Sequence, residues 1–136
     1  MAARSKARKR ALDVLFESEL RGLPLAATLD ERIVSAEPPV HEYTVTLARG
    51  IAEHQPRIDE LIAEYAHGWT LDRMPAVDRN VLRIGIFEIL YVDDVPDAVA
   101  VSEAMNLVAD LSTDESPSFV NGVLGNILRD KPALSA

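Results

Sequence analysis

The side chains best suited to chemistry in this 136-residue sequence are cations crowded at its beginning. The first ten residues, which we call the basic arm, hold five basic side chains and no acidic one: Arg4, Lys6, Arg8, Lys9 and Arg10. Guanidinium and ammonium groups bind phosphate oxygens, and several such contacts give a salt-sensitive affinity for nucleic acid. Residues 11–136 carry nine basic and 22 acidic side chains, a net charge of −13, so they would confine a polyanion to the arm. The alternative is a solubilising, disordered terminus.

A second group of candidate side chains lies at the start of the last predicted helix. Ser116 and Pro117 are typical of a helix start, and Ser118, Phe119 and Asn121 follow them. Recognition of single-stranded RNA uses a stacking aromatic ring with amide or hydroxyl groups, and a helix N-terminus favours phosphate. These residues could act together with the arm, or Phe119 could simply belong to the core.

Signatures of catalysis are scarce. The sequence has no cysteine, which excludes disulfides, thiolate metal sites and thiol nucleophiles and suits a reducing cytoplasm. His41, His54 and His67 form no metal-binding H-E-x-x-H pair, and neither a glycine-rich phosphate loop nor a nucleophile elbow occurs. No apolar stretch approaches the ~18 residues of a membrane-spanning helix. We therefore predict a cytoplasmic protein that is not an enzyme and needs no metal, cofactor or membrane.

Glycine and proline punctuate the chain at intervals that suit helices. We expect an all-α fold of about seven helices, arranged as two packed bundles in a single compact domain over residues 1–136. The expected helices are 5–21, one opening at Pro24, 40–53, 56–68, 76–92, 97–111 and one from 116 to about 128. The helix over 76–92 is apolar almost all round, which predicts that it lies at the centre.

Several single residues have predicted packing roles. Phe16 and Leu20 continue the apolar stripe of the first helix, and Trp69 is expected in the core between the bundles. Gly122 and Gly125 lie inside the last helix, where each costs about 1 kcal/mol relative to alanine. That cost predicts a close approach to the helix backbone, and we expect a neighbouring helix to make it.

Four short strings stand in a characteristic order between about Arg4 and Leu128. They are Ala7-Arg8 with Ala11, Leu15 and Phe16; Asp78-Arg79-Asn80-Val81-Leu82-Arg83-Ile84; Asp94-Val95-Pro96 with Val99-Ala100 and Glu103-Ala104; and Phe119-Val120-Asn121-Gly122-Val123-Leu124. Together they resemble the NusB family of bacterial transcription antitermination factors.

This resemblance implies an all-helical fold of two packed bundles and a role in transcribing ribosomal RNA operons. It implies binding to the boxA element of nascent RNA together with NusE, a ribosomal protein that also acts in elongation, so that RNA polymerase resists Rho-dependent termination. The acidic body would complement a basic ribosomal protein. The implied RNA-binding residues are Arg4, Lys6, Arg8, Lys9, Arg10, Ser118, Phe119 and Asn121, and the implied NusE-binding residues are Phe16, Asp72 and Asp78.

The chain departs from the family pattern at Ser118, where many relatives carry a basic residue, and this places more of the phosphate binding on the arm. Two other functions remain open. One is an RNA-binding domain like that of ribosomal RNA cytosine methyltransferases, although an end at Ala136 leaves no room for the catalytic unit. The other is a protein-interaction module whose arm binds an acidic partner. Members of the family can be monomers or homodimers.

Overall fold

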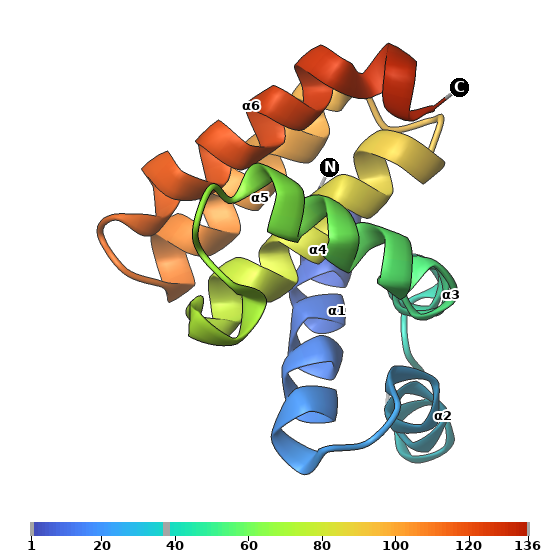
Figure 1. Ribbon diagram of the computed structural model, residues 1–136. Helices are drawn as coiled ribbons and strands as arrows, with labels where there is room; N and C mark the ends of the chain where they lie inside the picture. The colour runs from blue at the N-terminus through green and yellow to red at the C-terminus, as the bar shows by residue number, and fades with distance from the viewer. Residues whose placement is uncertain (1, 37–38, 136) are drawn as a thin grey trace.

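Six α-helices and one short 3₁₀ helix make up this computed structural model, which describes residues 2–36 and 39–135 (Figure 1). They are α1 (Ala2–Arg21), α2 (Leu25–Ser35), α3 (Glu42–Tyr65), η1 (Leu71–Arg73), α4 (Ala76–Tyr91), α5 (Asp97–Leu111) and α6 (Ser116–Leu134). Those residues contain no strand, and the predicted all-α class is confirmed. Within the same ranges, none of the helices combines the length and the apolarity that a membrane crossing demands.

The helices form two groups of three that share one core, as predicted. α1, α2 and α3 pack together, α4, α5 and α6 pack together, and α4 also packs against α1 and α3. Figure 1 shows α4 passing through the middle of the molecule, between α1 and the α5–α6 pair. α4 buries Asp78 and every residue from Asn80 to Ile89, which confirms it as the central helix.

The predicted break at Pro56 is wrong, because α3 runs through this proline without interruption. A proline inside a helix removes one backbone hydrogen bond, but Pro56 is exposed, so water can solvate the carbonyl that loses its partner. Ile51 before it and Ile58 and Leu61 after it are fully buried, and this packing holds both halves on one axis. Two predicted helices are therefore one. The short segment before Pro75 forms the 3₁₀ helix.

α1 ends directly before Gly22, whereas α3 ends at Tyr65, three residues before the predicted stop at Gly68. Another glycine lies at a close crossing of two helices. Gly22 (φ 65°) and Gly68 (φ 91°) adopt the left-handed conformation at the predicted stops after α1 and α3. Gly50 lies where α3 crosses α4, and a Cβ there would overlap the ring of Phe87. The absent side chain thus lets the two bundles approach each other closely.

Candidate nucleic-acid interface

The basic arm is helical from Ala2 onward, which places its cations on different faces of α1. Arg8 points inward and is only 2% exposed. Its Nε donates to both carboxylate oxygens of Glu88 at 2.9 and 3.0 Å, and its Nη1 donates to Glu103 at 3.1 Å. The prediction that Arg8 meets phosphate does not fit this position. Arg8 instead fastens α1 to α4 and α5.

Tyr43 on α3 completes the buried cluster around Glu88. Its hydroxyl donates a hydrogen bond to Glu88, and its ring lies under the Arg8 guanidinium, 5.6 Å from the centroid. Burial raises the pKa of the Glu88 carboxyl, whereas the Tyr43 hydroxyl and Arg8 act in the opposite direction. Burial and the hydrogen bond to Glu88 also raise the pKa of Tyr43. The cluster is fully hydrogen-bonded and fixes the direction of the arm.

Arg4 lies at the edge of the same cluster and is half-buried. Its guanidinium stacks 4.2 Å from the centroid of the Tyr43 ring, and Nη2 pairs with Asp94 at 3.1 Å. The carboxylate of Asp94 is exposed, so the contact is a surface ion pair that competes with water. Arg4 is therefore oriented by the body of the protein and still reaches the surface.

The three remaining arm cations face solvent. Lys6 is exposed, Lys9 pairs with Asp13 at 2.9 Å, and Arg10 lies 3.8 Å from the same carboxylate with 72% of its side chain exposed. Such pairs within one exposed helix face are worth only about 0–1 kcal/mol, so a phosphate can displace Asp13. Lys6, Lys9 and Arg10 therefore remain accessible to a polyanion.

The start of α6 is anchored from inside by Asp78 of α4. Asp78 is 3% exposed and accepts hydrogen bonds from Ser112 Oγ at 2.6 Å and Ser116 Oγ at 2.9 Å. Ser116 Oγ also accepts the backbone N–H of Thr113 at 3.2 Å. This contact explains why α6 begins at Ser116. It also corrects the prediction that Asp78 faces NusE, because the carboxylate is buried within the protein.

The outer side of the α6 start carries the predicted RNA-binding residues. Ser118 and Asn121 are exposed, while Phe119 is half-buried and packs against the core. A Cβ on Gly122 or Gly125 would meet no other atom of the described chain within 4 Å. The expected helix packing at these glycines is therefore wrong, and the backbone of α6 is bare along this side.

Trp69 joins this region, although the sequence predicted a core position for it. The indole is 53% exposed and lies beside the Phe119 ring, with centroids 6.2 Å apart and planes tilted by 58°. Both rings line a pocket of about 550 Å³ whose lining also includes Asp114 and Glu115. The α6 start thus offers aromatic surface among carboxylates. The sequence did not predict this position, because Trp69 lies outside the predicted helices and no helical spacing of apolar residues indicates whether it is buried.

The predicted NusE-binding residues divide in the same way between surface and interior. Phe16 on α1 is 43% exposed and Asp72 on η1 is exposed. Leu20, one turn further along α1, is 76% exposed, whereas the stripe predicted a core position. Phe16 and Leu20 together leave apolar surface on the second half of α1.

The fold and these surfaces define an all-helical, two-bundle protein with a cationic helix face, and comparisons with known proteins identify its family. The chain matches the NusB family over residues 5–129 and belongs to that family of transcription antitermination proteins. It is 69% identical to transcription antitermination protein NusB of Nocardioides sp. over 99% of this chain and 100% of that one. The corresponding protein of Thermobifida fusca is 53% identical over 98% of this chain and 94% of its own length.

Two solved structures place the fold in the same family. NusB of T. maritima matches with a TM-score of 0.84 and 34% identity, covering 93% of this chain and 91% of that one. A crystal structure of the antitermination factors NusB and NusE in complex with dsRNA matches with a TM-score of 0.80 and 27% identity, covering 95% and 98% of the chains. The resemblance predicted from the four sequence strings is therefore confirmed.

Proposed function

We propose that this chain binds the boxA element of nascent ribosomal RNA together with NusE and helps RNA polymerase resist Rho-dependent termination. The observation that carries the proposal is the accessible row of Lys6, Lys9 and Arg10 on a body that is otherwise strongly acidic. Membership of the NusB family adds the transcriptional role, and the solved NusB–NusE–dsRNA complex supports both partners. The protein acts in the cytoplasm as a binding factor without catalysis, and it reaches RNA polymerase through other Nus factors.

The RNA contacts fall into two kinds. Lys6, Lys9 and Arg10 bind phosphates, with Arg4 at the edge of the same face. Ser118, Phe119 and Asn121 contact bases, because an exposed hydroxyl, a ring and an amide can stack on bases and hydrogen-bond their edges. Arg8 acts indirectly by holding the arm against α4.

The test compares a boxA RNA with a scrambled RNA of equal length, with and without NusE, at two salt concentrations. We expect tighter binding of boxA, a further gain with NusE, and affinity that falls as salt rises. Equal affinity for the two RNAs in the presence of NusE would contradict the boxA assignment and favour a general protein-interaction module.

NusE binding is assigned to Phe16, Leu20 and Asp72, which are exposed on α1 and η1. Asp72→Lys should slow association with NusE several-fold, because a charge at an interface rim acts mainly on the association rate. Asp30→Lys, at an exposed position on α2, is the matched control and should leave the rate unchanged. Identical association rates for the two variants would remove Asp72 from the interface.

A further inference from the structure

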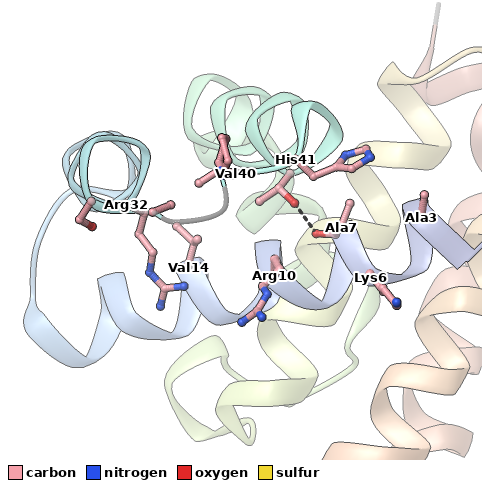
Figure 2. Close-up of a pocket in the computed structure, with 12 residues that line it drawn as sticks. Ala3, Lys6, Ala7, Arg10, Val14, Arg32, Val40 and His41 are labelled. Atoms are coloured by element: carbon pink, nitrogen blue, oxygen red, sulfur yellow. Dashed lines mark hydrogen bonds between the residues drawn. The ribbon is translucent and has the colours of Figure 1, made fainter.

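A pocket beside the basic arm is unlike the rest of this acidic protein. It lies between α1, the end of α2 and the start of α3, and its volume is about 670 Å³ (Figure 2). Lys6, Arg10 and Arg32 contribute to its lining, and none of the described residues that line it is acidic. Two further pockets of the described chain each carry three carboxylates, and this one differs from both in being cationic.

The cations of this pocket differ in availability. Arg32 is engaged by Glu17, which accepts its Nε at 2.8 Å. Lys6 is exposed, and within residues 2–36 and 39–135 Arg10 has only the long contact with Asp13, so these two can accept an anion at the rim. Figure 2 shows both side chains leaving the same side of α1, and four residues of helix separate them by about 6 Å along the axis. They form a two-point site for phosphate oxygens.

The inside of the pocket is apolar, and a hydrogen bond joins two of the helices that form it. Val14, Val40 and Pro39 are among its walls. Thr44 Oγ1 donates to the Ala7 carbonyl at 2.9 Å, and this hydrogen bond, drawn as the dashed line in Figure 2, ties α3 to α1. A bare anion would leave these walls unused, whereas a ligand with a charged end and a flat organic body would cover them. The volume lies within the roughly 300–1,000 Å³ of small-molecule sites.

His41 supplies a directional polar group to the same pocket. Its Nδ1 accepts the backbone N–H of Tyr43 at 3.0 Å and caps α3. In the neutral ring the proton then lies on Nε2, which is a donor. A carbonyl of a nucleobase or a ribose hydroxyl is the matching acceptor, which favours a nucleotide over a simple amphiphile.

We propose that this pocket receives one nucleotide of the bound RNA, with its phosphate on Lys6 and Arg10 and its sugar and base against the apolar walls. The proposal rests on the RNA binding proposed above and adds to the arm's open face a pocket whose other lining residues come mainly from the end of α2, the start of α3 and the connection between them. Because Lys6 and Arg10 belong to both surfaces, an RNA strand that follows the arm passes the mouth of the pocket.

Photochemical cross-linking locates the nucleotide directly. The full-length protein is irradiated with boxA RNA that carries 4-thiouridine at one uridine at a time, then digested with trypsin. One position should cross-link to the peptide 33–49, which contains pocket residues of α2 and α3 and belongs neither to α1 nor to α6. Cross-links confined to peptides of α1 and α6 would overturn the proposal.

A matched pair of variants tests the energetic contribution. Ser35→Glu adds a negative charge to the pocket lining, and Thr46→Glu adds the same charge at an exposed position of α3 that does not line it. We expect Ser35→Glu to weaken boxA binding about tenfold relative to Thr46→Glu, as the loss of one nucleotide contact does. The melting temperatures of both variants control for folding, and equal affinities would overturn the proposal.

Two further outcomes distinguish failure of the pocket assignment from failure of the proposed RNA-binding function. If the wild-type protein binds no boxA RNA, with or without NusE, the proposed function fails and the pocket assignment fails with it. If RNA binds without a cross-link to 33–49, the pocket assignment alone fails. Titration with uridine monophosphate by NMR covers the free ligand: shifts at the pocket without that cross-link would assign it to a free nucleotide and overturn the RNA assignment.

Discussion

The starts of α1 and α6 are anchored to the protein in the same way, but their exposed surfaces carry opposite charge. Each is fastened to the central helix α4 by a buried carboxylate: Glu88 holds α1 through Arg8, and Asp78 holds α6 through Ser116. Outside these anchors, α1 exposes Lys6, whereas α6 exposes aromatic surface between carboxylates. Charge acts over about 8 Å at physiological salt, while stacking acts only in contact. If the chain binds RNA as proposed, we expect α1 to attract the RNA and the start of α6 to discriminate among bases.

The anchors themselves should differ in strength, because one is a buried ion pair and the other joins a carboxylate to hydroxyls. Glu88→Ala leaves the Arg8 guanidinium buried without its main partner, which should cost about 3–5 kcal/mol of unfolding free energy. Asp13→Ala removes only a half-buried surface partner of Lys9 and Arg10 and should cost less than about 1 kcal/mol. Urea unfolding measures the unfolding free energy of both variants. Similar losses for Glu88→Ala and Asp13→Ala would show that the Arg8–Glu88 anchor contributes little to stability.

The α1 surface should govern the salt dependence of RNA binding. Replacing Lys6, Lys9 and Arg10 with alanine should lower the log–log salt slope by about 2 and the affinity roughly a hundredfold near 0.1 M salt, since each phosphate contact contributes about 0.7. The loss should be the same for boxA and scrambled RNA. Arg49, Arg57 and Arg73 are exposed elsewhere, and their triple alanine variant is the charge-matched control. An equal slope in the two variants would refute the assignment.

The α6 anchor should prove structural and not part of the NusE interface. Asp78→Ala removes the acceptor of two hydroxyl hydrogen bonds and should cost about 1–3 kcal/mol of unfolding free energy. NusE affinity, measured well below the melting temperature, should remain close to that of the wild type. Asp114→Ala, at an exposed carboxylate of the same region, should change stability by less than about 0.5 kcal/mol. A stable Asp78→Ala variant that no longer binds NusE would reverse this interpretation.

The aromatic surface at α6 should affect RNA affinity more than it affects folding. Phe119→Leu keeps an apolar side chain against the core but removes the ring, so the folding cost should stay below about 1.5 kcal/mol. RNA affinity should fall about tenfold, with an unchanged salt slope. Phe16→Leu makes the same chemical change on α1 and should leave RNA binding intact. A melting temperature that drops while affinity holds would make Phe119 a core residue only.

Helical periodicity alone would have predicted that Arg8 and Asp78 are buried. Arg8 stands three, four and seven residues before Ala11, Leu12 and Leu15, so the buried stripe of α1 extends to it. Asp78 has the same relation to Val81, Leu82 and Gly85 on α4. Both charges follow the apolar face and are buried with it. The charge of each side chain suggested a surface position, but its place on the apolar face of the helix determined that it is buried.

The sequence by itself determined the helical class, the central position of α4, the end of α1 before Gly22 and the family, because each depends on local pattern. Tertiary structure alone decided that α3 continues through Pro56, that Trp69 and Leu20 stay exposed, and that Gly50 rather than Gly122 allows close packing. Only the fold also brought together the walls of the cationic pocket, which come from three helices and from the connection between α2 and α3. Burial depends on which elements meet, and residues far apart in the chain acquire partners only when the core assembles.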